Sequence, residues 1–453
     1  MAQGQIVIVG GGLVGQTLAH RLTRIGHDVT LVEQDEGTVR DLSETLDVRL
    51  VEGNGATSPV LREAGIEQAE LVVAATESDA ANMVVGLLAA HVFHTPRVVV
   101  RVRDVGHEEG FEKGCSDEPM NRVCINPDTA SVDRIANLLD VPGAVDVMQF
   151  FGGEVLVAGF RISGASDFAG LRVSDMKLLF AATPTLAVAI ERSGRWLVPG
   201  GGETIAAGDL VYFAIASRDL DDVLSLVGVP MERRRGRVMI SGASSIGLAL
   251  ARRLDAVGVR VVVIENDGER ARQAASELEH VLVIHGRGTD QALLEDEEIE
   301  SVAAFVALSD DHETNLASGL LARRLGCGRS IVLVDNPAMA SMVGDIGIDA
   351  IISPRLLTIA QALRYIRGGG VRAGAALLGD AIDVLQIEVE QPCRLTGGRL
   401  VDLDLPSGVL VAALRREDAL LFPSGETQVA PGDEILIIST TDLSGRVREF
   451  IEA

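Results

Sequence analysis

The hydrophobic pattern along the chain alternates between two kinds of segment. Uninterrupted apolar runs, such as IVIVG (6–10) and LVVAA (71–75), are typical of strands buried on both faces of a parallel sheet. After the first run, Val14, Leu18 and Leu22 recur at the spacing of one helix face. The order strand, glycine-rich turn, helix is therefore predicted at the start of the chain, as in a doubly wound α/β sheet.

This pattern occurs twice. The segment IVIVGGGLVG (6–15) matches VMISGASSIG (238–247) at an offset of 232 residues. Further along, VAATESDAAN, which ends at Asn82, matches VALSDDHETN, which ends at Asn315. A long repeat with an almost constant offset indicates a duplicated domain.

A second, smaller section follows each copy. The segment 198–215 parallels 422–439, which places Asp209 opposite Asp433, and turn residues there separate short β-branched runs. We predict two tandem Rossmann-like, doubly wound parallel-sheet domains, each followed by a small α+β C-lobe that a helix closes. A second ligand site, a hinge contact and a dimerisation surface all remain open for these lobes. The predicted boundaries are 1–136, 137–230, 231–368 and 369–453, with the arginine-rich stretch 231–237 as a solvated linker.

The first copy contains a GxGxxG turn between strand and helix. The first glycine permits the tight turn, the second lets the backbone approach a pyrophosphate, and the third allows close packing of the helix. The amino end of the helix offers free N–H groups and a positive dipole end to phosphate. The turn and the start of the helix comprise Gly10, Gly11, Gly12, Leu13, Val14 and Gly15.

Four more residues are expected at the same crevice. Glu33 ends the next strand, 21 residues after Gly12, where an acid accepts hydrogen bonds from ribose hydroxyls and repels a 2′-phosphate. Thr76 and Glu77 follow a strand at its carboxyl end, where ligands lie in open α/β sheets. Arg101 lies in a buried strand, so it needs an anion, either a bound pyrophosphate or a local carboxylate. These features favour NAD(H) or adenine nucleotides over NADP(H).

The second copy has lost part of this chemistry. Ser244 stands where the second glycine is expected, and Leu333 stands at the position of Arg101. Glu265 remains opposite Glu33. Two interpretations stay open, a worn or re-specialised copy and a competent second site. The candidate residues of that site are Gly242, Ser244, Ser245, Ile246 and Glu265.

Composition narrows the classes of function. Hydrophobic residues make up 47% and aromatic residues 3% of the chain, which suits parallel sheets with aliphatic cores. A formal charge of −25 argues against nucleic acid and against direct adhesion to anionic lipid. The four cysteines form no CxxC pair, so neither thiol chemistry nor a structural metal is expected. The chain shows neither a signal peptide nor an apolar run of membrane-spanning length, which predicts a cytoplasmic protein.

An oxidoreductase is the main alternative. The turn GASSIG is similar to that of short-chain dehydrogenases, which need a tyrosine with a lysine four residues later. Tyr212 and Tyr365 are instead followed at that spacing by Ala216 and Gly369. No other catalytic constellation is evident, so we expect no enzyme. An oxidoreductase with an unrecognised catalytic site and a nucleotide-sensing scaffold for another transporter remain as alternatives.

The segment EGNGATSPVLREAGIEQAELVVAATESDAAN (52–82), with its counterpart in the second half, resembles the tandem regulator-of-K⁺-conductance (RCK) family. The resemblance covers nearly the whole chain. It implies NAD⁺, NADH, ATP or ADP bound by Gly10 to Val14, Glu33, Asn54, Thr76, Glu77 and Arg101. The family commonly has Asp at the position of Asn54 and Ala at that of Gly55, which bears on how the adenine end is recognised.

The same resemblance implies regulation and not catalysis. Four chains of such a protein are expected to form a ring of eight nucleotide-binding lobes. The ring would lie on the cytoplasmic face of the membrane, under a dimeric subunit that translocates potassium.

Overall fold

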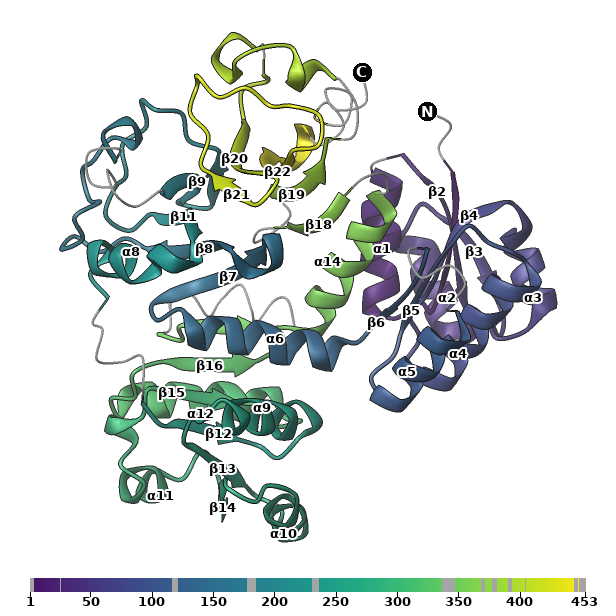
Figure 1. Cartoon of the computed structure of the whole chain (residues 1–453). Helices are drawn as coiled ribbons and strands as arrows, with labels where there is room; N and C mark the ends of the chain where they lie inside the picture. The colour runs from purple at the N-terminus through teal and green to yellow at the C-terminus, as the bar shows by residue number, and fades with distance from the viewer. Residues whose placement is uncertain are drawn as a thin grey trace. The chain divides into compact units, whose positions relative to one another are not determined.

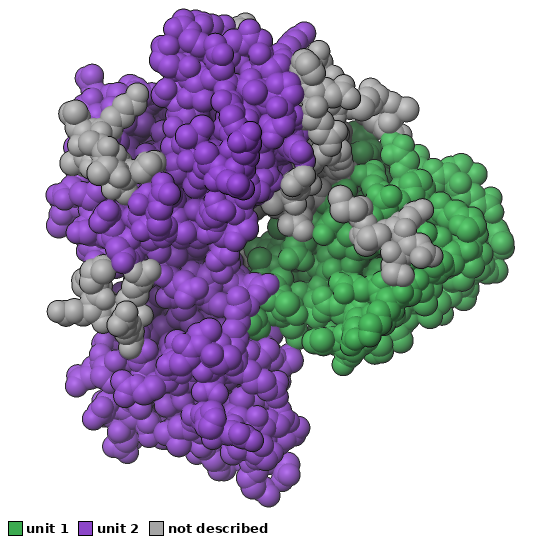
Figure 2. All heavy atoms as spheres, viewed as in Figure 1, with its two compact units in different colours: residues 1–132, 353–367 green, residues 133–352, 368–453 purple. Residues whose placement is uncertain are grey.

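The computed structural model describes residues 4–24, 26–115, 121–176, 185–229, 236–335, 347–367, 371–376, 381–389, 393–403, 405–443 and 447. Figure 1 shows the elements that these residues form. The chain divides into two compact units, residues 1–132 with 353–367 and residues 133–352 with 368–453 (Figure 2). The first unit therefore takes one segment from late in the chain.

The first unit contains a six-stranded parallel sheet with the strand order β3-β2-β1-β4-β5-β6. Its strands are β1 (Gln5–Val9), β2 (Asp28–Glu33), β3 (Arg49–Glu52), β4 (Ala69–Ala74), β5 (Arg97–Arg101) and β6 (Arg122–Ile125). The helices between them are α1 (Leu13–Arg24), α2 (Glu36–Thr45), α3 (Ser58–Glu63), α4 (Asp79–Leu87) and α5 (Val105–Gly114). The strand order reverses beside β1, which brings the turn after β1 and the loop after β4 to one edge. The predicted doubly wound sheet is confirmed.

Alternate residues of these strands feed two separate cores. Val7, Val9 and their neighbours pack under α3, α4 and α5. Ile6 and Ile8 pack under α1 and α2 and under α14 (Pro354–Arg367), a helix from the second copy. Figure 1 shows α14 lying along α1. The apolar face of α1 is thus covered by a helix that lies more than 300 residues away in the sequence.

The second sheet repeats the first, with the order β14-β13-β12-β15-β16-β17. Its strands are β12 (Val238–Ser241), β13 (Val261–Glu265), β14 (Leu282–His285), β15 (Ala304–Ala307), β16 (Ser330–Leu333) and β17 (Ala350–Ile352). Its helices are α9 (Ser245–Ala256), α10 (Gly268–Glu277), α11 (Gln291–Asp296) and α12 (His312–Arg324). Two Rossmann-like sheets in one chain confirm the duplication.

The helix α6 (Pro127–Asp140), the counterpart of α14, ends against the second copy. The buried guanidinium of Arg329, just before β16, donates hydrogen bonds to the carbonyl oxygens of Leu138, Val141 and Ala144. At the equivalent position of the first copy, Arg97 Nη1 donates to the carbonyl oxygen of Tyr365, near the end of α14, at 3.2 Å. The two copies thus exchange these helices, and each helix end meets an arginine of the other copy.

Each small lobe is a five-stranded antiparallel sheet, with the orders β10-β9-β11-β8-β7 and β18-β19-β22-β20-β21. The first lobe comprises β7 (Ala144–Phe150), β8 (Val155–Arg161), β9 (Thr185–Arg192), β10 (Arg195–Leu197), β11 (Leu210–Ala216) and α8 (Leu220–Val227). The second comprises β18 (Val371–Ala376), β19 (Ile382–Glu388), β20 (Val409–Arg416), β21 (Ala419–Leu421) and β22 (Glu434–Thr440). The two lobes share one core, in which Val157 and Tyr212 pack with Val384 and Leu436.

One ion pair is duplicated in these lobes. Asp209 receives two hydrogen bonds from Arg192, at 2.8 and 2.6 Å, and Asp433 receives two from Arg416, at 2.8 and 2.7 Å. The hydrogen bonds from Arg192 hold the pKa of Asp209 below its ordinary value, although burial opposes them. The aligned aspartates therefore fix the same turn in both lobes. The linker residues 231–235 lie outside the described residues, and the four predicted boundaries stay predictions.

Candidate nucleotide-binding site

Each of the three glycines of the GxGxxG motif stands in the first turn for a different physical reason. Gly10 has a φ of +111°, and a Cβ there would lie 2.9 Å from the carbonyl carbon of Ala75. A Cβ on Gly15 would lie 1.9 Å from the carbonyl oxygen of Gly10, so only glycine lets α1 pack this closely. A Cβ on Gly12 would meet no atom within 4 Å. The space at Gly12 is therefore open to a ligand.

The amino end of α1 faces that open space. Gly12 has no side chain that could cap the helix, and Gly12 and Leu13 are both exposed, whereas Val14 is buried in the core. The first N–H groups of any helix have no acceptor inside the helix. They and the positive end of the helix dipole form a phosphate-binding arrangement at this point.

The carboxylate of Glu33 is turned toward the glycine turn. It accepts hydrogen bonds from the backbone N–H groups of Gly11 at 2.6 Å, Gln34 at 2.7 Å and Asp35 at 3.0 Å. These bonds hold β2 and the turn together. A carboxylate has about four acceptor positions, so one remains for a ribose hydroxyl, and that role of Glu33 stays a prediction.

A fully buried asparagine joins Thr76 to Arg101. Asn82 accepts hydrogen bonds from Thr76 N at 2.9 Å and Thr76 Oγ1 at 2.6 Å, and its Nδ2 donates to the carbonyl oxygen of Arg101 at 2.9 Å. Arg101 is 6% exposed, and its Nη1 donates to the carbonyl oxygen of Thr76 at 3.3 Å. The strand ends expected at the crevice are therefore tied together, with Glu77 exposed in the same loop.

We did not assign a role to Asn82 from the sequence, although the repeat contains its signal. Asn315, its counterpart, accepts from Ser309 N at 2.8 Å and donates to the carbonyl oxygen of Leu333 at 3.1 Å. Because the acceptor on β16 is a backbone atom, the network survives the change from arginine to leucine. An asparagine at the equivalent position of both copies, after a strand and a Thr or Ser, points to such a network.

Asn54 and Gly55, which differ from the residues common in the RCK family, both have local structural explanations. The side chain of Asn54 accepts a hydrogen bond from Ala56 N at 2.9 Å and so forms a turn with its own backbone. A Cβ on Gly55 would lie 2.3 Å from Cγ1 of Val9. An alanine at 55 would therefore require the side chain of Val9 to move, and glycine fits the side chains of this sheet.

The second crevice is more closed at its turn. Ser244 is 6% exposed, and its Oγ donates to the carbonyl oxygen of Leu308 at 2.6 Å and accepts from Gly247 N at 3.2 Å. The serine thus caps α9, where Gly12 leaves α1 uncapped. Gly242 keeps the left-handed backbone at φ +109°, Ile246 is buried and Ser245 is exposed. Glu265 accepts from Ala243 N at 2.6 Å, as Glu33 does from Gly11.

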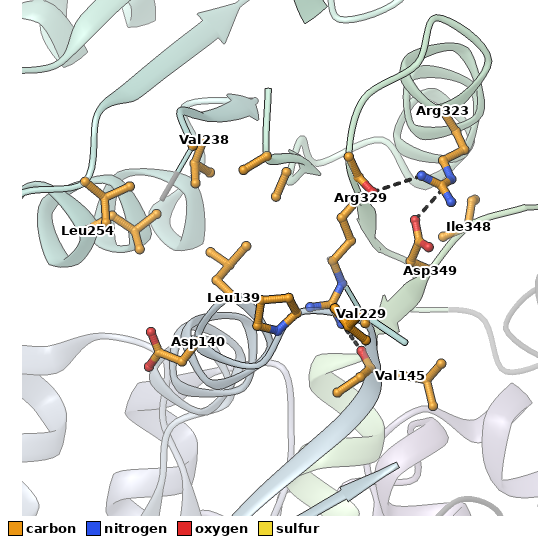
Figure 3. A pocket seen from close by; sticks show the side chains of 18 of the residues that line it. Leu139, Asp140, Val145, Val229, Val238, Leu254, Arg323, Arg329, Ile348 and Asp349 are labelled. Carbon is orange, nitrogen blue, oxygen red and sulfur yellow. Dashed lines mark hydrogen bonds and ion pairs between the residues drawn. The ribbon is translucent and has the colours of Figure 1, made fainter. Parts of the chain in front are cut away.

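A separate cavity of about 890 Å³ lies at the amino ends of the second sheet's strands, opposite the carboxyl ends that form the crevice (Figure 3). Three of its charged side chains have partners: Arg323 pairs with Asp349 at 3.3 Å, and Arg329 binds the end of α6. Ligands of open α/β sheets lie at the carboxyl ends of the strands, so this cavity is not the nucleotide crevice. No cluster that could hold a metal occurs among the described residues.

The sequence matches known family models in three places. The TrkA-N domain model matches residues 6–121 and again 238–354, and the TrkA-C domain model matches residues 384–452. The chain belongs to the TrkA family. Both TrkA-N matches fall on the two parallel sheets, and the TrkA-C match falls on the second small lobe. This family is not enzymatic, which confirms the expectation that the chain is no enzyme.

Individual TrkA relatives agree with this assignment, and solved structures share the fold. The Trk system potassium uptake protein TrkA of Halomonas elongata is 33% identical over 439 residues, covering 96% of this chain and 95% of the relative. The crystal structure of the GsuK RCK domain superposes with a TM-score of 0.62 at 19% identity, covering 100% of this chain and 95% of that one. The GsuK channel bound to NAD gives 0.61 at 18% identity, covering 100% and 79%. Among the helices of the described residues, none is long and apolar enough to cross a membrane.

Proposed function

We propose that this protein is the nucleotide-sensing regulatory subunit of a Trk-type potassium-uptake system. It binds NAD⁺ or NADH, or ATP or ADP, in the first crevice and responds by a change of shape. The membrane subunit of the system then conducts K⁺ at a different rate. In this proposal the nucleotide is a signal and stays chemically intact.

The observation that carries the proposal is the uncapped amino end of α1. Gly12 leaves it open, Glu33 lies at the end of the adjacent strand, and the buried Arg101 lies across the strand-order reversal. A cation and a helix dipole at one edge suit a pyrophosphate. The GsuK channel, which shares this fold, is bound to NAD in its solved structure.

The fold supplies a route from the ligand to the second half of the chain. The buried residues Leu18 and Leu22 of α1 share a core with Ile359 and Leu363 of α14. A nucleotide that shifts the amino end of α1 therefore pushes on a helix that belongs to the second copy. Packed cores respond to such shifts by moving between discrete arrangements.

The proposed assembly is a homotetramer, peripheral on the inner face of the cell membrane, under a potassium-translocating membrane subunit. Four tandem chains would form a ring of eight nucleotide-binding lobes. The ligand must bind one ring shape better than the other, because equal affinity shifts no equilibrium. Couplings of about 1 to 3 kcal/mol at each of several sites would add to a decisive bias.

The test is calorimetric titration of NADH and ADP into matched variants. Arg101→Ala should weaken binding at the first crevice about tenfold or more, because a buried cation next to the phosphates is lost. Leu333→Ala removes the side chain at the same position of the second copy and serves as the control. Equal losses in the two variants, or turnover of NADH with loss of its absorbance, would contradict the proposal.

A further inference from the structure

The cavity at the amino ends of the second sheet's strands carries an excess of positive charge. The charged residues that line it are Arg161, Arg260, Arg323, Arg329, Asp140 and Asp349. The chain as a whole has a formal charge of −25. A cavity in which arginines outnumber acids, in so acidic a chain, favours an anionic occupant.

Arg329 is the most deeply buried of these cations. It is 7% exposed, and Figure 3 shows its side chain extending toward Val229 among the lining residues. Burial lowers its pKa to about 10, so the guanidinium stays charged at neutral pH. Its two Nη atoms donate to carbonyl oxygens at the end of α6, whereas its buried Nε donates to no group among the described residues.

Asp349, a carboxylate of the same cavity, already has other partners. Its Oδ2 pairs with Arg323 Nε at 3.3 Å and accepts a hydrogen bond from Ser330 N at 2.8 Å. The carbonyl oxygens that bind Arg329 carry no formal charge. Buried charges in proteins are normally paired with an opposite charge, so Arg329 has the surroundings of a cation whose anion is still to come.

The first copy has such an anion. Arg97, the counterpart of Arg329, forms an ion pair with Glu70 at 3.7 Å. The pairing of β1 with β4 and of β12 with β15 aligns Glu70 with Ala303. The second copy therefore keeps the arginine and has a methyl group in place of the acid.

Much of the remaining wall is apolar. The apolar lining residues labelled in Figure 3 are Leu139, Val145, Val229, Val238, Leu254 and Ile348. Ligand pockets are lined mainly by apolar side chains with a few polar groups, and a volume of about 890 Å³ lies within their usual range. The cavity therefore suits an organic anion that has one acidic group and an apolar body.

We propose that this cavity is an effector site for a small organic anion with a carboxylate or phosphate group. The acidic group accepts a hydrogen bond from Arg329 Nε and supplies the negative charge that Glu70 supplies in the first copy. The apolar body packs against Leu139 and Leu254. Because Arg329 also binds the end of α6, an occupied cavity strengthens the contact between α6 and the second sheet. The proposal does not depend on the nucleotide crevices, which lie at the carboxyl ends of the strands.

The experiment is calorimetric titration of two probes, 1-naphthyl phosphate and 1-naphthoate, into the full chain. Saturating ADP is present, so that the nucleotide crevices do not take up the probes. Each anion should bind once per chain, and the uncharged 1-naphthalenemethanol should bind about tenfold more weakly or less. The tighter of the two anions identifies the acidic group as phosphate or carboxylate. Probe binding should also slow hydrogen exchange over residues 136–145.

Ala303→Glu restores the acid of the first copy and is the decisive variant. There the carboxylate of Glu70 fills the space that a Cβ on Gly4 would need, and Gly236 is the glycine at the same position of the second copy. Ala303→Glu should weaken both anions about tenfold or more without lowering the unfolding temperature, because Arg329 keeps its contacts and gains an acid. Ala303→Gln, with the same size and no charge, is the control and should keep most of the affinity.

Three results would overturn the proposal. The first is equal affinity of Ala303→Glu and Ala303→Gln for the anions, and the second is an alcohol that binds as tightly as the anions. The third is no binding of either anion, which would mean that solvent alone satisfies Arg329. Titration of ADP into both variants should match the unchanged chain, so a failure at this cavity leaves the proposed function standing.

Discussion

Single glycines decide what the first turn can do, because each one meets a different structural requirement. Gly10 supplies a left-handed backbone, Gly15 supplies close approach, and Gly12 supplies empty space. The sequence shows three glycines in a motif and cannot rank them. The structure ranks them by what a Cβ would meet, which separates residues needed for folding from one needed for a ligand.

Two substitutions in this turn test that ranking. Gly12→Ser, which copies Ser244, should change the free energy of unfolding by less than about 0.5 kcal/mol and weaken nucleotide binding about tenfold. Gly15→Ala should lower the stability by about 1 to 3 kcal/mol, because its Cβ overlaps the carbonyl oxygen of Gly10. Thermal unfolding and calorimetry on the same samples measure both effects. A destabilised Gly12→Ser variant with normal affinity would reverse our assignment.

At the scale of elements, the exchanged helices α6 and α14 connect the two copies. The carbonyl groups at a helix carboxyl end need partners, and a cation there also complements the helix dipole. Arg329 does both for α6, and burial lowers its pKa to about 10, so it remains charged at neutral pH. Arg97 does the same for α14 at the carbonyl oxygen of Tyr365, and its side chain is 28% exposed. The contact between an arginine and a helix carboxyl end is thus more deeply buried when the arginine comes from the second copy.

The difference in burial predicts unequal costs. Arg329→Ala should destabilise the protein by about 2 to 4 kcal/mol, because three carbonyl oxygens lose a charged donor in a buried place. Arg97→Ala should cost about 1 kcal/mol. Hydrogen exchange over 136–145 and over 362–367 measures the two effects separately. Arg253→Ala, which breaks an exposed pair with Asp133, is the control, and an equal effect of Arg253→Ala and Arg329→Ala would refute the role of Arg329.

At the scale of the whole molecule, neither copy is complete by itself. The core under α1 needs Ile359, Ala362 and Leu363 from α14, so the first parallel sheet is finished only after the second copy is made. The two small lobes likewise share one core. Because both halves belong to one chain, their association is intramolecular and does not depend on the protein concentration.

A truncated chain tests this dependence. Residues 1–230 alone should self-associate and unfold at a lower temperature than the full chain, because the apolar face of α1 loses its cover. Light scattering and thermal unfolding give both values, and a peptide of residues 353–367 added in trans should reduce the association. A monomeric fragment as stable as the full chain would show that α14 is dispensable.

Much of the fold and of the candidate site could be predicted because its signals are local. Apolar periodicity determined the strands and helices, and near-identical spacing in the two halves determined the duplication. The turn from Gly10 to Gly15 and the strand-end position of Glu33 follow from a short motif. The loss at Ser244 and Leu333 was also visible, since it required only a comparison of the chain with itself.

Only the tertiary structure decided which distant residues meet. The exchange of α6 and α14 and the arginine at each helix end depend on pairs far apart in sequence. Such contacts need no fixed spacing, because backbone carbonyls and exposed charges accept partners from anywhere in the fold. The sequence therefore determined the elements and their repetition, and packing determined how the two copies depend on each other.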